Sequence, residues 1–277
     1  CIQPHSGHPR QEVWFQHNMD TTTEGATGAE GAMEAAATLS LSGDFTAFTF
    51  WVATAVMFMG AAFFFMERFT VKKEWQTSLT VACLVCLVAF WHYLYMRAGY
   101  MGELSYQEAG SSPTELRYVD WLITVPLQIV EFYLIVAAVS AVSLSLFWKL
   151  LAGSLVMLVG GYMGEAGVMG VDAMTGFIIG MIGWVYVIWL IWAGDAAKAA
   201  SGAKNENVAF AFNGIKWIVT VGWIIYPIGY YVGYIAGDGS EVAGLNSLYN
   251  LADVVNKFLF GLVIWHAAMK DSGISKA

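Results

Sequence analysis

The chain has 277 residues, of which 58% are hydrophobic and only 12% are charged. Soluble globular domains carry about twice that charged fraction, so the composition excludes an ordinary soluble domain and indicates a helical protein that crosses a lipid bilayer several times. The net charge is −8 and the sequence has no basic patch to hold phosphate, so we expect no nucleic-acid partner.

Residues 1–43 form a polar, mildly acidic segment rich in Thr, Gly and Ala, without the apolar core of a signal peptide. We interpret the segment as an extracellular tail without chemistry, either left after signal cleavage or in part a cloning remnant. It contains His5, His8 and His17. Their irregular spacing favours incidental polar residues over metal ligands, so no metal site is predicted.

Seven apolar runs follow, each long enough to cross a bilayer, which takes about 20 residues. They lie near residues 45–68, 75–97, 115–139, 144–164, 174–195, 208–235 and 246–269. Their short connections leave no room for a separate soluble domain, so we predict an all-α bundle of seven transmembrane helices over residues 44–272. Cys83 and Cys86 fall inside the second run, and no disulfide framework is expected.

Basic residues mark one side of this bundle. They are Arg68, Lys72, Lys73, Lys149, Lys198, Lys204, Lys270 and Lys276. The other side has only Arg10 and Arg97, but it has many acids, among them Glu103, Glu108, Glu115, Glu165, Asp172, Asp238 and Glu241. By the positive-inside rule the N-terminus is expected outside the cell and the C-terminus, with a short tail at 273–277, in the cytoplasm.

Few ionisable side chains remain inside the predicted spans, and such groups indicate function because an isolated charge in a membrane is costly. They are His92, Arg117, Asp120, Glu131, Asp253 and Lys257, with Lys216 and His266 near span ends. A single buried histidine such as His92 is more often a satisfied core residue than a functional one.

The third span reads RYVDWLITVPLQIVEFYLI. Asp120 and Glu131 lie eleven residues apart in it, so they share one helix face to within roughly 20° and are separated by roughly 16 Å along the axis. Thr124 lies on the same face. Glu131 has no basic residue nearby in the sequence, and burial favours its neutral form, which suits a proton relay. Arg117 is open to three interpretations: it reaches the outer interface, it forms a structural bridge with Asp120, or it lowers the cost of a functional carboxylate there.

Lys257 lies in the seventh span, in the run LADVVNKFLF, one helical turn after Asp253. Spacing alone slightly favours a plain lysine–aspartate bridge. The other interpretation is an amine that forms a Schiff base with a carbonyl ligand, stabilised by Asp253 and Asp120. Neighbouring spans offer enough ring side chains to enclose a planar polyene, which favours the second interpretation. A row of aromatic side chains is, however, more often a matter of packing alone. These residues are Trp121, Trp184, Trp223, Tyr226 and Pro227.

At this point the sequence resembles the microbial rhodopsins and, within them, the proteorhodopsins. The resemblance covers roughly residues 44–272 and is carried by RYVDWLITVPLQIVEFYLI, LYNLADVVNKFLFG, FWHYLYMR and LVGGYMGEAG. It implies all-trans retinal bound to Lys257 as a protonated Schiff base, in a multi-pass protein of a bacterial inner membrane. It also implies rings of five or six protomers.

The resemblance further implies a role for the polar residues. Asp120 would be the primary counterion and proton acceptor, and Asp253 the second counterion. Glu131 would be the proton donor, and Thr124 completes the Asp–Thr–Glu triplet associated with outward proton pumps. His92 matches a histidine that hydrogen-bonds the acceptor aspartate. The aromatic residues above and Pro227 match retinal-pocket positions, and Tyr249 with Arg117 completes the counterion cluster.

Gln128 predicts the colour. In proteorhodopsins an apolar residue at this position accompanies green absorption, and glutamine accompanies blue absorption. Excitation moves positive charge from the Schiff base toward the ring, so a polar group that favours the ground-state charge distribution widens the energy gap. We therefore predict a blue-absorbing form.

The predicted function is a light-driven outward proton pump, a transporter and not an enzyme, with the lipid bilayer and protons as its only partners besides its own copies. The alternative is a slow-cycling sensory photoreceptor of the same fold that signals to a transducer, which Glu131 disfavours. Chloride pumping is disfavoured because Asp120 occupies the place of the anion, and sodium pumping because the triplet does not read Asn–Asp–Gln. A retinal-free transporter or receptor would leave Lys257 unexplained.

Overall fold

The computed structural model describes residues 43–137, 142–202, 204–237 and 242–274. Over these residues the regular structure is entirely helical, which confirms the all-α prediction. The helices all lie within the compact unit Phe45–Ala277. The interpretation of the N-terminal tail, including His5, His8 and His17, concerns residues outside the described part of the chain.

Seven helical spans in the described residues are long and apolar enough to cross a membrane, as predicted. The α-helices are α2 Phe45–Glu67, α3 Lys73–Tyr100, α4 Thr114–Ala137, α5 Leu144–Glu165, α6 Ala173–Trp192, α7 Asp195–Ser201, α8 Glu206–Trp217, α9 Ile225–Tyr230, α10 Val242–Asp253 and α11 Phe260–Asp271. A short 3-10 turn, η1 Val168–Gly170, precedes α6, and π-helical segments η2 Ile218–Gly222, η3 Tyr231–Ala236 and η4 Val254–Leu259 continue the sixth and seventh spans.

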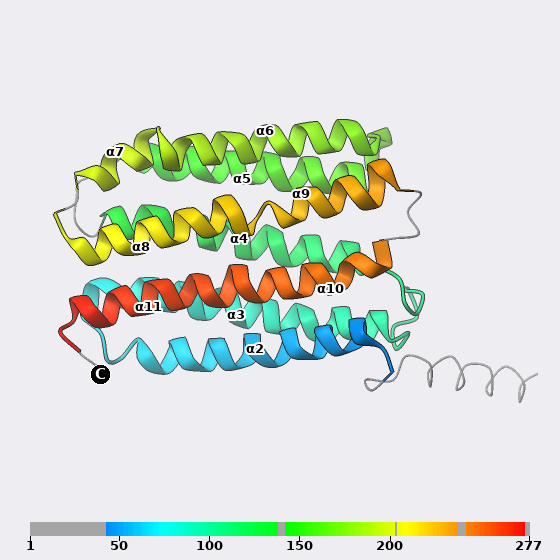
Figure 1. Cartoon of the computed structure of the whole chain (residues 1–277), viewed down its shortest axis with the longest axis horizontal. Helices are drawn as coiled ribbons and strands as arrows, with labels where there is room; N and C mark the ends of the chain where they lie inside the picture. Colours follow the sequence, from blue (N-terminus) through cyan, green and yellow to red (C-terminus); the bar gives the residue numbers. More distant parts are fainter. Residues whose placement is uncertain (1–42, 138–141, 203, 238–241, 275–277) are drawn as a thin grey trace, which may run out of the picture. The chain divides into compact units, whose positions relative to one another are not determined.

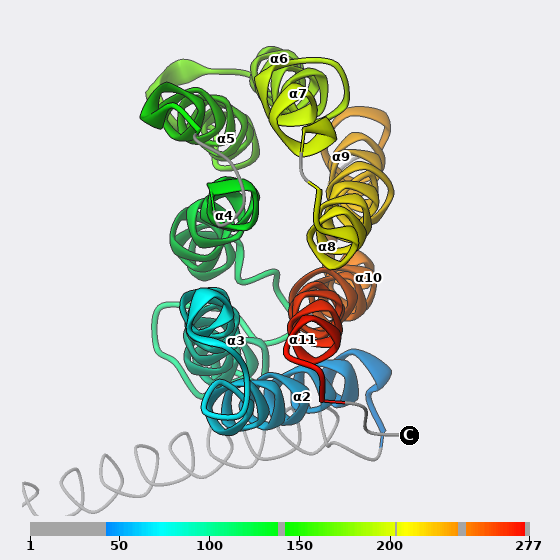
Figure 2. The same cartoon turned by 90° about the vertical axis from the view of Figure 1, so that its left-hand side faces the viewer.

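The spans lie side by side along one direction (Figure 1). Seen end-on, they follow one another in chain order around the bundle, and α10 returns to pack against α2 (Figure 2). The third, sixth and seventh spans therefore face a common interior, because α4 and α8 are in contact and η2 lies against η4.

The third span shows how the sequence orients its helices. The apolar side chains of Val119, Leu122 and Ile123 on α4 are 46%, 38% and 43% exposed, whereas Asp120 and Glu131 on the same helix are fully buried. This arrangement directs apolar surface outward to lipid and ionisable groups inward, as expected of a multi-pass membrane protein.

The sixth span departs from regular α-helix next to its proline, Pro227. In the wider turns of η2, carbonyl groups accept side-chain hydrogen bonds from other spans: Trp184 Nε1 donates to Val219 O at 3.3 Å, and Asn256 Nδ2 donates to Gly222 O at 3.0 Å. Within a membrane such bonds are valuable because no water is present to satisfy a carbonyl. The irregular segment thus ties the fifth and seventh spans to the sixth.

Candidate functional site

The centre of the site is Lys257, on η4, held between two carboxylates. Its Nζ lies 2.6 Å from Asp120 Oδ2 and 2.7 Å from Asp253 Oδ2. All three side chains are buried. The structure therefore brings together the amine and both predicted counterions, from the third and seventh spans.

Asp253 is saturated with hydrogen bonds. Besides Lys257, it accepts from Tyr93 Oη at 2.9 Å, from Tyr226 Oη at 2.6 Å and from Trp121 Nε1 at 3.3 Å. Hydrogen bonds to an ionised acceptor are stronger than those between neutral groups. The surroundings of Asp253 therefore stabilise its negative charge.

Asp120 has far fewer partners. Its Oδ1 is buried and has no hydrogen-bond partner among the described residues. His92 Nδ1 lies 3.6 Å from this oxygen, which is longer than a hydrogen bond, and 2.9 Å from Val88 O. The Thr124 hydroxyl donates to the main-chain oxygen of Asp120 at 2.9 Å, and not to its carboxylate. The hydrogen bond expected from His92 is thus a looser contact, and Asp120 keeps one oxygen open to a proton.

Arg117 is buried, so the interpretation that it reaches the outer interface is wrong. The structural bridge to Asp120 is also wrong: the Arg117 Nη2 donates instead to Asn246 Oδ1 at 3.0 Å and to Asn250 Oδ1 at 3.1 Å. Its guanidinium carbon lies 5.4 Å from the centre of the Tyr249 ring, a cation–π contact. Arg117 and Tyr249 are therefore neighbours, as expected, and the arginine acts on the carboxylates from a distance.

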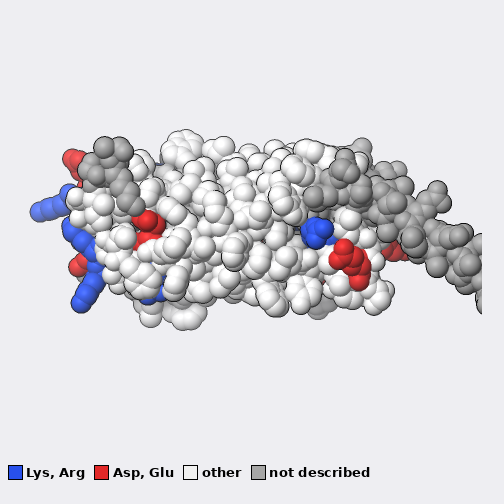
Figure 3. Space-filling view, turned by 90° about the horizontal axis from the view of Figure 1, so that it is seen from below, with Lys and Arg blue, Asp and Glu red and all other residues white. Residues whose placement is uncertain are grey.

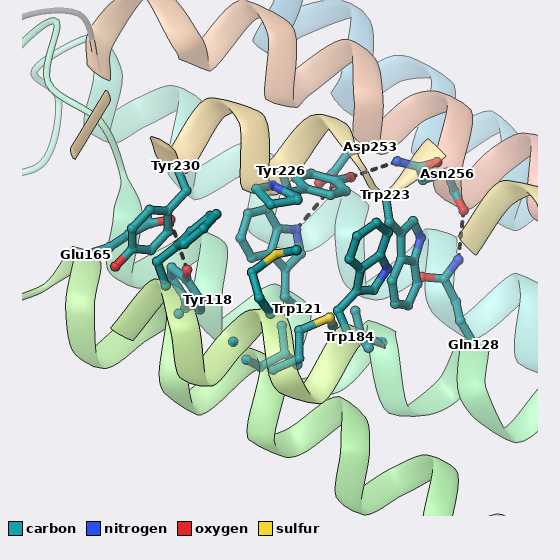
Figure 4. Close-up of a pocket in the computed structure, with 18 of the residues that line it drawn as sticks. Tyr118, Trp121, Gln128, Glu165, Trp184, Trp223, Tyr226, Tyr230, Asp253 and Asn256 are labelled. Carbon is teal, nitrogen blue, oxygen red and sulfur yellow. Dashed lines mark hydrogen bonds between the residues drawn. The ribbon is translucent and has the colours of Figure 1, made fainter. Parts of the chain in front are cut away.

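A cavity of about 100 Å³ opens beside Lys257. The five predicted pocket residues all line it, namely Trp121, Trp184, Trp223, Tyr226 and Pro227, and Figure 4 shows the four aromatic ones around the space. Gly161 and Gly180 lie in its wall and add no side chain. An amine at the wall of an apolar, ring-lined space fits a long apolar cofactor with a terminal carbonyl group, such as retinal.

Gln128 also lines this cavity. Its Nε2 donates to the main-chain oxygen of Asn256 at 2.7 Å (Figure 4). Because a carbonyl oxygen can only accept, this bond fixes which end of the Gln128 amide faces the seventh span. The predicted colour-determining residue is therefore tied to the residue that precedes Lys257.

Glu131 occupies a different environment, in the half of α4 nearer Ala137. It is fully buried, and among the described residues only the Ser78 side chain acts on its carboxyl group, without a well-formed hydrogen bond. On the same stretch of α4, the Phe132 ring packs edge-on against Phe212 with ring centres 5.5 Å apart. A carboxyl group in such surroundings favours its neutral, protonated form.

Several residues of the site were missed by sequence reasoning. Asn246 and Asn250 recur at helical spacing with Asp253 and Lys257, so a polar stripe along the apolar seventh span was the signal that could have found them. Tyr93, which also accepts from Arg117 Nη1 at 3.5 Å, gave no signal beyond following His92.

Glu165 was counted among the acids of the outer side, just past the predicted fourth span of 144–164, and it proves to belong to the helix itself. It is the last residue of α5, accepts a hydrogen bond from Tyr118 Oη at 3.0 Å and lines the cavity (Figure 4). The acid lies at the end of an apolar run, where sequence alone does not tell a helix end from a loop.

Comparisons with known proteins show which family the chain resembles. Residues 44–271 match the family model described as bacteriorhodopsin-like protein. Green-light absorbing proteorhodopsin of Gamma-proteobacterium EBAC31A08 is 50% identical over 83% of this chain and 88% of its own length. Blue-light absorbing proteorhodopsin of Gamma-proteobacterium Hot 75m4 is 50% identical over 81% of this chain and 86% of its own length.

Solved structures are similar as well. The crystal structure of blue light-absorbing proteorhodopsin from Med12 is 53% identical, with a TM-score of 0.70 over 82% of this chain and 100% of that chain. That of Exiguobacterium sibiricum rhodopsin is 35% identical, with a TM-score of 0.71 over 83% of this chain and 98% of that chain.

Proposed function

The chain belongs to the bacteriorhodopsin-like protein family, and from this premise we propose that it is a light-driven pump that moves protons outward across a bacterial inner membrane. The observation that carries the proposal is the position of one amine, Lys257, relative to two buried acids that lie in different environments. Lys257 touches Asp120, which has an open oxygen, and Glu131 lies eleven residues further along the same helix without a well-formed hydrogen bond among the described residues.

The residues of the cavity fit all-trans retinal as the chromophore. Lys257 Nζ would hold its carbonyl carbon, and the rings of Trp121, Trp223 and Tyr226 would flank its chain. When bound, retinal supplies the absorption of visible light and a change of shape that alters the proton affinity of the Lys257 nitrogen.

The chain's own groups would then set the path of the proton. Asp120 accepts it at Oδ2, the oxygen that Lys257 Nζ already contacts at 2.6 Å, while Asp253 stays charged because four donors surround it. Glu131 holds the proton that returns to Lys257, since burial keeps its carboxyl group neutral until it is needed.

The distribution of charge supports the outward direction. On the face shown in Figure 3 the middle of the bundle carries no Lys, Arg, Asp or Glu, and charged residues gather at its two ends. The connection that holds Lys72, and the first turn of α3 with Lys73, lie at the same end as the last turn of α11, with Lys270. By the positive-inside rule this end would face the cytoplasm, and Glu131 would then lie on the cytoplasmic side of Lys257.

We propose blue absorption on the strength of Gln128. The green- and blue-absorbing relatives are both 50% identical to this chain, so overall identity does not choose between the colours. Gln128 lines the cavity and is fixed by its bond to Asn256 O. Assembly into rings of five or six copies stays a prediction.

The test is the pH of an unbuffered suspension of retinal-supplied cells under blue light, with and without a protonophore. Cells with the unchanged chain should acidify the medium, and the protonophore should abolish the change. Asp120→Asn should remove the signal, whereas Asp172→Asn, an exposed carboxyl in the connection before α6, should leave it intact. Coloured cells without any pH change would refute the pump and favour the slow-cycling photoreceptor.

A further inference from the structure

Asn256 makes more contacts within the site than its place in the chain next to Lys257 requires. It is 2% exposed and lies directly before Lys257. Its side-chain Nδ2 donates to Gly222 O at 3.0 Å and to Tyr226 Oη at 3.2 Å. Its main-chain oxygen accepts from Gln128 at 2.7 Å, so the third, sixth and seventh spans meet at this one residue (Figure 4).

The bonds around Asn256 have a fixed direction. Gly222 O can only accept, so the side-chain amide of Asn256 must present its NH₂ group to the sixth span. Tyr226 Oη accepts from that group and gives its own proton to Asp253 Oδ1, 2.6 Å away. A hydroxyl that accepts a hydrogen bond becomes a stronger donor, because bonds in a chain polarise one another. The relay Asn256–Tyr226–Asp253 therefore strengthens the hold on the Asp253 charge.

A purely structural role explains this side chain poorly. Its Oδ1 is buried and has no hydrogen-bond partner among the described residues, and an unpaired buried acceptor is costly. Room for the amide exists only because residue 222 is glycine: a Cβ there would overlap Asn256 Oδ1. An apolar residue would fill the same space without the unpaired oxygen, so the NH₂ group is the part of the side chain that matters.

We propose that Asn256 is a positioning residue that, through Tyr226, keeps Asp253 as the permanent negative charge of the site, so that Asp120 alone takes the proton. The inference rests on the proposed function and adds to it a residue, Asn256, that maintains the different roles of the two carboxylates. Charged and titratable groups face Asp253 from every neighbouring span; they are Lys257, Asp120, Arg117, Tyr93 and Tyr226, and His92 faces Asp120.

The test is the absorption spectrum of the purified, retinal-loaded full chain across a pH series. Asn256→Leu removes the donor to Tyr226 at similar volume. The acid-induced colour change should then occur at a higher pH, by less than about one pH unit, because Asp253 keeps its bond from Tyr226 and loses only the strengthening of that bond. Asn213→Leu, on the exposed side of α8, should leave the midpoint unchanged.

Two further variants separate positioning from folding. Gly222→Ala should displace the Asn256 amide without changing it, and should reproduce the shift if Asn256→Leu yields no folded protein. In a Tyr226→Phe background the relay is already broken, so Asn256→Leu should cause no additional shift. An unchanged midpoint in Asn256→Leu or Gly222→Ala, in protein that binds retinal and pumps as the unchanged chain does, would overturn the inference while leaving the proposed function intact. If the unchanged chain takes up no retinal, the proposed function itself fails.

Discussion

The two halves of the bundle interior surround their carboxyl groups with opposite environments, one polar and one apolar. Around Lys257, Asp253 alone receives four hydrogen bonds and Arg117 is held by two asparagines. Around Glu131, on the same helix as Asp120, only the Ser78 side chain acts on the carboxyl group among the described residues, without a well-formed hydrogen bond. The first region can hold separated charges, and the second can hold only a neutral acid. A proton path with one direction needs both environments, the charged one and the neutral one, along the same helix.

The largest expected effect comes from removing the acid of the polar half. Asp253→Leu should destabilise the folded protein by about 3–5 kcal/mol, because it leaves Tyr93, Tyr226 and the Lys257 charge without their shared acceptor. The measurement is the unfolding midpoint of the purified chain in denaturant. Asp195→Leu, at an exposed ion pair with Lys149, is the control and should change stability by less than about 1 kcal/mol. Equal losses in the two variants would mean that the network around Asp253 is not a source of stability.

Removing the acid of the apolar half should affect rate and not stability. Glu131→Gln keeps the size of the side chain and takes away its acidic proton, so recovery of the absorption after a flash should slow by about 10²-fold, as loss of a general acid does. The change in unfolding free energy should stay within about 1 kcal/mol, since no well-formed hydrogen bond is lost.

The control for this variant is Glu206→Gln, an exposed acid in the first turn of α8. It should leave the recovery rate unchanged. If Glu131→Gln recovered at the unchanged rate as well, Glu131 would not be the donor, and the contrast between the two halves would have no function.

A smaller effect is expected at the border between the two regions. Gln128→Leu removes the bond to Asn256 O and should move the absorption maximum to longer wavelength, with a stability change of about 1 kcal/mol. Absorption spectra of the purified, retinal-loaded variant measure the shift. Leu155→Gln, on an exposed part of α5, serves as the opposite exchange away from the cavity and should leave the colour as it is. A Gln128→Leu spectrum identical to that of the unchanged chain would refute the assignment of colour to this position.

The sequence allowed the seven spans, the facing of Lys257 and Asp120, and the pocket rings to be predicted, because each depends on helical periodicity or on a strong family resemblance. It did not reveal which donors each acid receives. The bonds from Tyr93 and Tyr226 to Asp253, and from Arg117 to Asn246, join residues on different spans. Such contacts depend on the rotation and tilt of packed helices, and the apolar pattern fixes these only loosely.

The smallest effect is expected at Asp172, a carboxyl group outside the membrane that can be compared with the buried Asp253. Asp172 caps the N-terminus of α6 from the position before it, and its side chain accepts from Thr175 N at 3.0 Å and from Thr175 Oγ1 at 2.7 Å. These bonds lower the pKa of the Asp172 carboxyl below its ordinary value of 3.8. Because the folded pKa is the lower one, the stabilisation is fully present well above pH 3.8 and is lost as the pH falls through the folded value.

Asp172→Ala should therefore lower the thermal midpoint slightly at neutral pH, as the loss of a helix cap does, and the difference from the unchanged chain should shrink as the pH falls below 3.8. Thermal unfolding followed at neutral and at acid pH measures it, with Asp44→Ala before α2 as a second acid substituted in parallel. A difference that stayed constant into acid would show that the Asp172 charge is not its source. Asp172 has two hydrogen bonds at the surface and Asp253 has four in a buried network that includes the Lys257 charge, so both the number of bonds and the burial make the effect at Asp253 the larger one.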